Sequence, residues 1–472
     1  MEIKFITERG SGKLIVMFLG WGVEATAPGH LSKPSYDIVA VSDYRGIEDS
    51  GAWAPLAELA AEYDEVVTVA WSFGVRAAAD FLRGPGKALP VTKCIAVNGT
   101  PAHIHDTKGI PTAIFSGTVA NLSEQNVRKF RRRMFASAAD FARFQEEAPC
   151  TRTFENLLQE LETFGRLEPL EGSTDFFDCA VIGDRDAIFP PANQLACWDG
   201  NVQTEVIEGM PHFPDFQRIL DSHIIDKQLV RERFSASAST YRDNAPVQAE
   251  VARRLWENTR PYAEAALRER GDILEIGVGK GLLTQLYAPE TGDHRLRLWD
   301  IAAIDSAHLP ADAELRRCDA EIAVRELPDR SMRMILSAST VQWFNNPQEF
   351  VRQAFRKLAP GGVLALSTFG ARTFREITTV TGTGLRYPDA DSLAAAAAAE
   401  GCRPVICRTE TIVQTFASPL ELLLHLKLTG VNAVSRGGGE TAAAMRLIRS
   451  LGQTDGEPSL TYEPIYLVAI KK

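Results

Sequence analysis

The chain has 472 residues, of which 45% are hydrophobic and 24% are charged. This composition excludes a largely disordered protein and allows two or three domains of roughly 150 residues. The net charge of −10 and the seven scattered cysteines, which form no CxxC pair, argue against a dedicated nucleic-acid binder and against a disulfide framework. No apolar run approaches the roughly 18 residues of a membrane span. We therefore expect a cytoplasmic protein that binds neither nucleic acid nor a membrane.

The first half of the chain alternates strand-like and helix-like segments, a βαβ rhythm that predicts a mainly parallel sheet. The strands are expected at Lys13–Leu19, Asp37–Val41, Glu65–Trp71, Lys93–Val97, Phe177–Ile182 and Val202–Ile207. Between about Ser123 and Arg166 the pattern is helical without strands. This stretch predicts a helical insertion, or lid, over the carboxyl edge of the sheet, where α/β proteins place their sites.

A candidate nucleophile, Ser72, directly follows the strand Glu65–Trp71. Ala70 and Gly74 flank it in the pattern Ala-x-Ser-x-Gly. Such small residues permit the cramped strand–turn–helix that lifts a serine Oγ above a sheet. Taken alone, the pattern also fits an ordinary serine at a helix N-terminus. The choice between the two interpretations depends on whether an acid and a histidine follow.

The chain order serine, acid, histidine is typical of the α/β-hydrolase fold. Asp186 lies in the loop after the strand Phe177–Ile182, with Asp184 as the alternative acid. His212 lies in the loop after the strand Val202–Ile207. We therefore predict that Ser72, Asp186 and His212 are catalytic.

Two backbone N–H donors are needed to stabilise the oxyanion of ester hydrolysis. Phe73, next to the serine, and Trp21, just after the first strand Lys13–Leu19, are the predicted donors. Several segments of residues 1–220 resemble the biotin-pathway esterases that cleave pimeloyl-[acyl-carrier protein] methyl ester. These segments are Phe18–Gly22, Val69–Gly74, Ala96–Thr100, Gly109–Thr118 and Arg185–Phe189. The resemblance implies a carboxylesterase that acts on a methyl ester at the far end of a carrier-bound acyl chain.

A basic run, Arg128 to Arg133, lies in the predicted helical insertion of this acidic chain. Such a run is often only a solvated helix face. A positive patch also suits an acidic acyl-carrier protein, because it raises the encounter rate and orients the partner. We therefore predict that Arg128, Arg131 and Arg132 contact the carrier.

A second βαβ series begins after a charged stretch, Lys227 to Arg233, and predicts two domains of residues 1–227 and 228–472. Its strands are expected at Ile273–Ile276, Leu296–Trp299, Leu315–Cys318, Met334–Ser337, Val363–Thr368, Pro404–Thr415 and Thr461–Ile470. The late strands are joined without short crossovers, which predicts an antiparallel edge strand on a parallel sheet.

The segment Ile273–Gly281 contains the pattern Glu-x-Gly-x-Gly-x-Gly, whose glycines let the backbone approach a nucleoside. Asp300, at the end of the next strand, is placed to accept both ribose hydroxyls. Asp319 follows the third strand, where an acid can meet an adenine amino group. Together these landmarks resemble the class I S-adenosylmethionine-dependent methyltransferases, which implies a Rossmann-like fold and a methyl donor without a metal. The implied cofactor-binding residues are Glu275, Gly277, Gly279, Gly281, Asp300, Asp319, Ala320 and Ser337.

Other segments are similar to the malonyl-[acyl-carrier protein] O-methyltransferases of biotin synthesis. These segments are Arg233–Ala245, Ser337–Phe344, Leu426–Ala433 and Leu460–Tyr466. A carboxylate is ionised at neutral pH and is itself the nucleophile, so its methylation needs alignment and exclusion of water rather than a general base. Tyr241 and Trp343 are the candidates for enclosing donor and acceptor, and Arg386 and Lys427 are the candidates for binding the malonyl carboxylate.

The two halves predict reciprocal chemistry on acyl groups held by a carrier protein. The second half would methylate the free carboxylate of malonyl-carrier protein, and the first half would hydrolyse the ester at pimeloyl length. One alternative is a methyltransferase for another small acid or a quinone precursor, fused to an unrelated serine esterase. Another alternative retains one half only as a carrier-docking module without activity.

Overall fold

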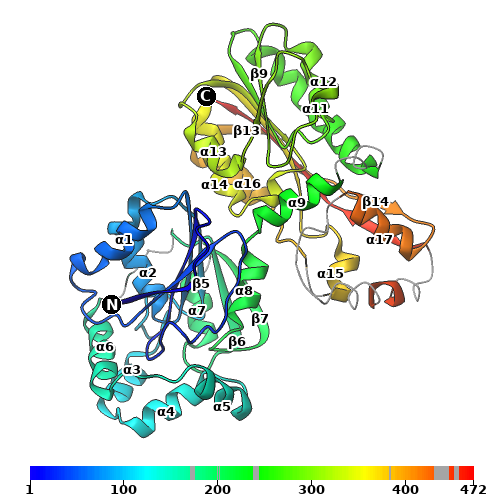
Figure 1. Cartoon of the computed structure of the whole chain (residues 1–472). Helices are drawn as coiled ribbons and strands as arrows, with labels where there is room; N and C mark the ends of the chain where they lie inside the picture. The colour runs from blue at the N-terminus through cyan, green and yellow to red at the C-terminus, as the bar shows by residue number, and fades with distance from the viewer. Residues whose placement is uncertain are drawn as a thin grey trace. The chain divides into compact units, whose positions relative to one another are not determined.

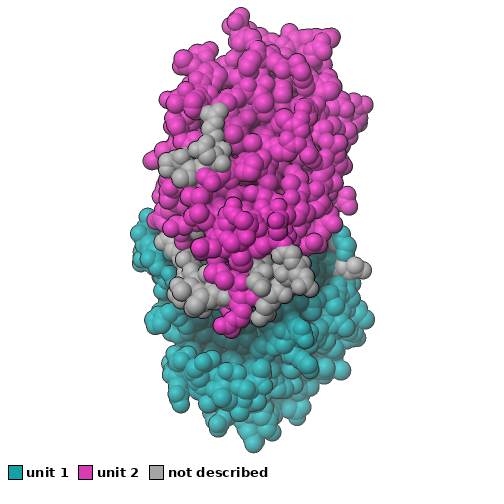
Figure 2. All heavy atoms as spheres, turned by 90° about the vertical axis from the view of Figure 1, so that its right-hand side faces the viewer, with its two compact units in different colours: residues 1–220 teal, residues 221–472 magenta. Residues whose placement is uncertain are grey.

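The computed structural model describes residues 1–168, 170, 176–198, 200, 202–237, 244–381, 384–429, 446–450 and 457–472. The chain divides into two compact units, Met1–Leu220 and Asp221–Lys472, which Figure 2 shows in different colours. The division falls a few residues before the boundary predicted at residue 228. Within the described residues, each unit is mixed α/β and contains its own seven-stranded sheet (Figure 1).

The sheet of the first unit has the strand order β1-β3-β2-β4-β5-β6-β7. Its strands are β1 (Glu2–Thr7), β2 (Lys13–Phe18), β3 (Asp37–Ser42), β4 (Glu65–Trp71), β5 (Val91–Val97), β6 (Cys179–Arg185) and β7 (Gln203–Pro211). All pairs are parallel except β1 with β3. Sequence reasoning missed β1, because this edge strand is only half-buried and lacks the continuous apolar run of β3 and β4, whose residues are all buried.

Helices of the first unit fall into two groups. The helices that alternate with strands or follow the last strand are α1 (Ala54–Ala61), α2 (Gly74–Arg83), α7 (Pro191–Trp198) and α8 (Phe216–His223). The insertion between β5 and β6 consists of α3 (Thr112–Ala120), α4 (Glu124–Arg133), α5 (Ala138–Glu147) and α6 (Phe154–Arg166). In Figure 1 the insertion helices lie together along one end of the unit. The insertion therefore begins before Ser123, where the helical pattern was expected to start.

The sheet of the second unit has the strand order β10-β9-β8-β11-β12-β16-β13, beside a two-stranded sheet of β14 and β15. The strands are β8 (Asp272–Ile276), β9 (Arg295–Asp300), β10 (Glu314–Arg317), β11 (Met332–Ala338), β12 (Leu358–Phe369), β13 (Cys402–Thr409), β14 (Ile412–Thr415), β15 (Ser459–Tyr462) and β16 (Pro464–Lys471). The antiparallel strand is β16, which pairs with both β12 and β13. It therefore lies one place inside the sheet, and β13 rather than β16 is the edge strand, contrary to the expected antiparallel edge.

Two apolar cores cover the two faces of this second sheet. Successive residues of β11 alternate between them, so Met334 and Leu336 belong to one core and Ile335 to the other, as the two-residue period of a strand requires. The helices are α9 (Lys227–Ser237), α11 (Pro246–Ala266), α12 (Thr284–Tyr287), α13 (Ala320–Ala323), α14 (Pro347–Lys357), α15 (Arg375–Thr381), α16 (Ala390–Ala399) and α17 (Pro419–Leu428). Helix α11 packs into the first core, and α14 and α16 pack into the second.

The turn from β4 to α2 is the tightest point of the first unit. Ser72 adopts a φ of 60°, a left-handed conformation that costs a residue with a side chain about 1–3 kcal/mol. At Gly74, an added Cβ would lie 2.1 Å from the Phe18 carbonyl oxygen and 2.6 Å from that of Leu19. These atoms belong to the backbone at the end of β2, so they cannot move aside without shifting the sheet. Glycine at position 74 is therefore what lets α2 start so close to β2.

We expect Gly74→Ala to lower the free energy of unfolding of the first unit by about 1–3 kcal/mol, the usual cost of overpacking a buried site. Gly117→Ala is the control, because Gly117 lies inside α3 with no atom within 4 Å of the added Cβ. There the methyl group should stabilise the helix by about 0.5–1 kcal/mol. Scanning calorimetry of the whole chain measures both changes, and an unchanged transition in Gly74→Ala would contradict the packing argument.

Candidate active sites

Ser72, His212 and Asp186 form a hydrogen-bonded chain at the carboxyl edge of the first sheet. The Ser72 Oγ lies 3.0 Å from His212 Nε2, and His212 Nδ1 lies 2.9 Å from Asp186 Oδ2. An ionised carboxylate only accepts hydrogen bonds, so Nδ1 carries the proton and Nε2 accepts from the serine hydroxyl. All three residues are buried. The arrangement can therefore pass the serine proton to the imidazole.

The carboxylate of Asp186 is fixed by three further donors. Its Oδ1 accepts the backbone N–H groups of Ile188 and Phe189 at 2.8 and 2.9 Å, and its Oδ2 accepts Gln194 Nε2 at 3.0 Å. The alternative acid, Asp184, accepts the N–H of Gly209 through Oδ1 at 2.7 Å instead. Asp186 is thus the acid that the structure brings to His212.

The backbone of His212 is held in place by two side chains from neighbouring strands. Trp71 Nε1 and Asn98 Nδ2 donate to the His212 carbonyl oxygen at 2.8 and 2.9 Å. Asn98 also accepts the N–H of Gly183 at 2.7 Å, and the ring of Phe189 lies parallel to the imidazole with centroids 6.1 Å apart. Sequence reasoning missed these residues, because they meet His212 only once the strands are side by side.

The predicted oxyanion donors lie next to Ser72. Phe73 follows the serine directly, and Gly20, which precedes Trp21, is so close that a Cβ there would come within 2.8 Å of Ser72 Cβ. Among the contacts of the described residues, neither the Phe73 N–H nor the Trp21 N–H has a hydrogen-bond acceptor. Two buried donors without a partner beside a serine hydroxyl suit a group that develops negative charge there.

The three predicted carrier-binding arginines on α4 have different surroundings. Arg128 is exposed, whereas Arg131 and Arg132 are half-buried. Arg131 Nη2 donates to the Gly22 carbonyl oxygen at 2.7 Å, and Arg132 Nη1 donates to that of Phe135 at 2.9 Å. Of the three, only Arg128 therefore presents an exposed side chain on the surface of the unit.

A cavity lies at the carboxyl edge of the second sheet. The predicted residues that line it are Gly277, Gly279, Asp300, Asp319, Ala320 and Trp343. Asp300 Oδ2 accepts the Gly279 N–H at 2.8 Å and its Oδ1 accepts the Ala302 N–H at 2.8 Å. Burial raises the pKa of Asp300, and these backbone donors oppose the shift. The glycine turn and Asp300 therefore lie together at this edge of the sheet.

Other predicted cofactor residues lie around this cavity rather than on its wall. Glu275 is buried and accepts the Thr284 hydroxyl at 2.6 Å, in a hollow that shares Gly277 and Gly279 with the cavity. Gly281 has a φ of 73° in the same turn. Ser337 is buried and donates to the Ile276 carbonyl oxygen at 3.1 Å. Ser337 does not line the cavity, whereas Ser339, two residues further along the chain, does.

The cavity and the hollow beside Glu275 contain buried polar side-chain atoms that a nucleoside could contact. The Ser339 Oγ and the Gln248 Oε1 are buried and have no hydrogen-bond partner among the described residues. Ser339 lines the cavity, and both residues line the hollow beside Glu275. A Cβ at Gly279 would meet no atom within 4 Å, so the backbone there is open to a ligand. Polar ligand atoms could satisfy both orphaned groups.

An aromatic hollow adjoins the cavity and shares Phe234, Ser339 and Trp343 with it. Its remaining lining is Gln248, Gln342, Phe369, Thr373, Phe374, Leu385, Tyr387 and Tyr462. Trp343 thus lines both spaces, and its role between donor and acceptor stays a prediction. Tyr241, its predicted companion, lies outside the described residues.

Neither predicted cation lines the aromatic hollow. Arg386 donates from Nε to the Ser222 carbonyl oxygen at 3.1 Å, and Lys427 is exposed on α17. The predicted roles of both residues in binding a carboxylate are therefore not supported by their positions.

Lys227 is a cavity residue that sequence reasoning missed. It is buried, and its Nζ lies 2.8 Å from Glu321 Oε2, 3.5 Å from Asp319 Oδ1 and 4.6 Å from the centre of the Phe344 ring. Its helix, α9, also supplies Val230 to the cavity wall. The charged composition of this stretch indicated a domain boundary, and nothing local distinguishes a buried lysine from a solvated one.

None of the described helices is long and apolar enough to span a membrane. Within the described ranges, no cluster of histidine, cysteine, aspartate and glutamate side chains is suited to holding a metal ion.

Comparison with known proteins matches each unit to a family. The model of the family described as pimeloyl-ACP methyl esterase BioG matches residues 1–219, and that of a methyltransferase domain matches residues 247–406. A malonyl-[acyl-carrier protein] O-methyltransferase of Bacteroides fragilis is 33% identical over 480 residues, which cover 97% of this chain and 93% of that protein. The crystal structure of BioG from Haemophilus influenzae is 32% identical and covers 45% of this chain and 94% of its own, with a TM-score of 0.38.

The glycine turn, the cavity and the family matches define an enzyme with an S-adenosylmethionine-dependent methyltransferase unit and a second, esterase-family unit. The chain belongs to the malonyl-[acyl-carrier protein] O-methyltransferase family, in a form that carries a BioG domain at its N-terminus. Both resemblances seen in the sequence are therefore confirmed, and with them a place in biotin synthesis.

The buried carboxyl of Glu275 gives the second unit a predicted pH dependence. Burial raises its pKa from 4.5 to about 7, so the folded state holds this proton more tightly than the unfolded state. The contribution of Glu275 to stability is therefore lost as the pH rises from 4.5 to about 7. We expect Glu275→Gln to flatten the fall of the melting temperature of the second unit across this range, measured without cofactor.

The control is Glu264→Gln, which removes an exposed carboxylate of α11 whose side chain is 82% accessible. It should leave the pH profile of melting unchanged. Parallel profiles for the native chain and for Glu275→Gln would contradict the assignment of this proton to Glu275.

Proposed function

We propose that the chain is a bifunctional enzyme that adds a methyl group to one carrier-bound acid and removes it from another. The second unit methylates the free carboxylate of malonyl-carrier protein, and the first unit, a serine hydrolase of the α/β-hydrolase fold, cleaves the methyl ester of pimeloyl-carrier protein. The observation that carries the proposal is that Ser72, His212 and Asp186 are joined by hydrogen bonds in a protein that also has a cavity suited to a methyl donor. Both reactions would take place in the cytoplasm, which suits seven cysteines that are all free thiols.

Ester cleavage begins with the Ser72 Oγ, which forms a bond to the ester carbonyl carbon as its proton passes to His212 Nε2. The carbonyl oxygen becomes an oxyanion, and the N–H groups of Phe73 and Trp21 stabilise it. The bond between the carbonyl carbon and the methoxy oxygen then breaks. His212 returns the proton to that oxygen, which leaves as methanol. Water repeats the sequence on the acyl-enzyme and releases the free carboxylate. Asp186 keeps the imidazole in the required tautomer throughout.

Methyl transfer needs two ligands side by side and little water between them. S-adenosylmethionine supplies an electrophilic methyl group attached to a sulfonium. Asp300 would bind the ribose, Asp319 the adenine amino group, and the Gly277–Gly281 turn would approach the nucleoside closely. The acceptor carboxylate would enter the aromatic hollow past Trp343, where apolar rings remove its hydration and make it a stronger nucleophile.

The arginine-rich helix α4 is the proposed contact for the carrier protein, and Arg128, Lys129 and Arg133 are its exposed positive side chains. A carrier with an acidic surface would be attracted to this local patch against the net charge of the whole chain. The patch would act mainly on the encounter rate.

We expect Ser72→Ala to abolish hydrolysis of pimeloyl-carrier methyl ester and to leave methylation of malonyl-carrier protein unchanged. Removing the nucleophile of a serine hydrolase lowers kcat by about 10⁴-fold or more. Mass spectrometry of both carrier proteins measures both activities in one sample. Hydrolysis that persists in Ser72→Ala would refute the proposed nucleophile.

The reciprocal variant is Asp300→Ala, which should abolish methylation and spare hydrolysis. Removing a half-buried, hydrogen-bonded carboxylate from the proposed ribose site should weaken S-adenosylmethionine binding by at least ~10-fold, since a charged hydrogen bond contributes about 1.5–3 kcal/mol. Calorimetric titration with S-adenosylhomocysteine measures the loss. The bifunctional proposal fails if the native chain lacks either activity, methylation of malonyl-carrier protein or cleavage of the pimeloyl ester.

A further inference from the structure

The loop that carries the Trp21 N–H is held by the helical insertion. Trp21 Nε1 donates to the Leu157 carbonyl oxygen of α6 at 2.8 Å, and the Trp21 ring meets Phe130 of α4 edge-on, with centroids 4.9 Å apart. Glu24 Oε1 accepts the backbone N–H groups of Thr151 and Arg152 at 2.6 and 3.1 Å. The segment on either side of the Trp21 peptide is therefore fixed from outside the sheet.

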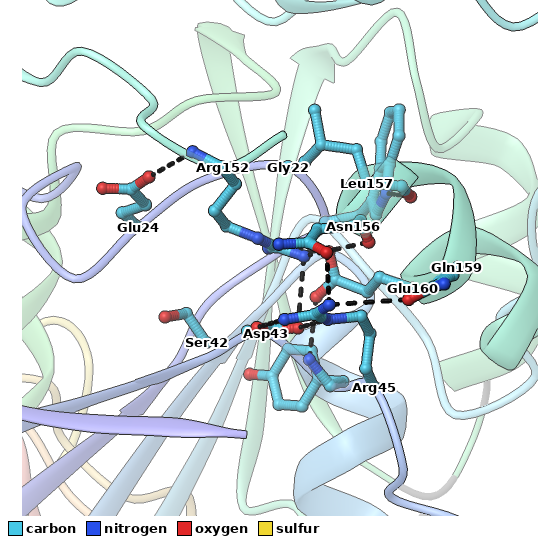
Figure 3. A network of polar contacts seen from close by, with 12 residues as sticks. Gly22, Glu24, Ser42, Asp43, Arg45, Arg152, Asn156, Leu157, Gln159 and Glu160 are labelled. Carbon is cyan, nitrogen blue, oxygen red and sulfur yellow. Dashed lines mark hydrogen bonds and ion pairs between the residues drawn. The ribbon is translucent and has the colours of Figure 1, made fainter. Parts of the chain in front are cut away.

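Figure 3 shows Glu24 and Gly22 near a partly buried network of polar side chains that includes Asp43, Arg152 and Glu160. Arg152 Nη2 contacts Asp43 Oδ1 at 3.2 Å, and its Nη1 contacts Glu160 Oε2 at 2.9 Å. Burial raises the pKa of Glu160, and the charge of Arg152 opposes this shift. Because a buried ion pair loses several kcal/mol when one partner moves away, α6 and the segment before it are firmly attached to the end of β3.

Arg131 also holds this loop, at the Gly22–Val23 peptide, which lies two peptide bonds beyond the one that carries the Trp21 N–H. Its Nη2 donates to the Gly22 carbonyl oxygen at 2.7 Å, and its Nε is buried without a partner. Gly22 has a φ of 74°, so the chain reverses at this point. The guanidinium is thus directed into the unit, toward the loop, rather than out toward solvent as Arg128 is.

We propose that Arg131 is a positioning residue for ester hydrolysis rather than a contact for the carrier protein. It holds the Gly20–Gly22 turn so that the Trp21 N–H faces the oxyanion that forms at Ser72. The inference rests on the proposed esterase function and deepens it. An oxyanion donor acts only when it lies at hydrogen-bond distance from the developing charge, and a shift of about 1 Å can cost roughly 100-fold in rate. The insertion would therefore set the reactivity of the serine site as well as cover it.

The test uses p-nitrophenyl acetate, an ester too small to reach a carrier-docking surface, with the full chain. We expect Arg131→Met to lower kcat by about 10–100-fold, with KM changed less than about 2-fold, because the lost interaction acts in the transition state. Arg131→Lys should recover part of the loss, since a lysine ammonium can also donate to the Gly22 carbonyl. Binding of a small alkylboronic acid, whose tetrahedral adduct with Ser72 imitates the oxyanion, should weaken in parallel with kcat.

The matched control is Arg143→Met, an exposed arginine of α5 in the same insertion whose side chain is 68% accessible. It should leave kcat for p-nitrophenyl acetate unchanged, and methylation of malonyl-carrier protein reports whether each variant chain is folded in its second unit. Melting of the first unit separates a positioning effect from unfolding, because Arg131→Lys should melt near the native temperature.

The outcomes separate the inference from the function on which it rests. Native kcat for the small ester in Arg131→Met, with slower cleavage of the carrier-bound ester, would make Arg131 a docking residue and overturn the inference. If Ser72→Ala still cleaves p-nitrophenyl acetate, the serine site itself is wrong and the esterase proposal fails. If Ser72→Ala is inactive while Arg131→Met is fully active, only the positioning role fails.

Discussion

Both units depend on a backbone that reverses in the left-handed region immediately after a buried parallel strand. In the first unit the residue is Ser72, and in the second it is Gly277, with φ values of 60° and 74°. Parallel strands end at a common edge, so a sharp reversal there leaves space above the sheet and exposes backbone N–H groups. At Ser72 this conformation strains the backbone and presents the hydroxyl above the sheet. At Gly277 it causes no such strain, because glycine has no side chain. The same constraint therefore presents a serine hydroxyl in one unit and opens a cavity beside a glycine turn in the other.

The parts of each site that the sequence could predict are those marked by local patterns. Ser72, Asp186 and His212 each follow a recognisable strand, and the glycine turn with Asp300 and Asp319 keeps its spacing. The missed residues act across elements. Gln194 and Asn98 support the triad from a helix and a neighbouring strand, and Lys227 enters the cavity from a helix whose composition resembles a linker. Strand order shows the same limit, because local pairing signals could not place β16 inside the sheet.

The described residues of each candidate site lie within one unit. Ser72, Asp186, His212 and the two predicted oxyanion donors belong to residues 1–220, and the residues that line the cavity of the second sheet belong to residues 221–472. The buried charges are likewise paired within a unit, as in Arg152 with Glu160 and Lys227 with Glu321. Substitutions in one candidate site therefore leave the described lining of the other site unchanged.

The interior position of β16 has a consequence for the order in which the protein is made. Residues 464–471 form the strand between β12 and β13, so the second sheet cannot be completed until residue 471 has left the ribosome. The strands of the first sheet are all present once residue 211 has emerged. Because domains fold during synthesis from the N-terminus, the first unit can reach its folded state on the nascent chain while the second sheet still lacks an interior strand. The candidate serine site would thus form earlier in translation than the complete methyltransferase sheet.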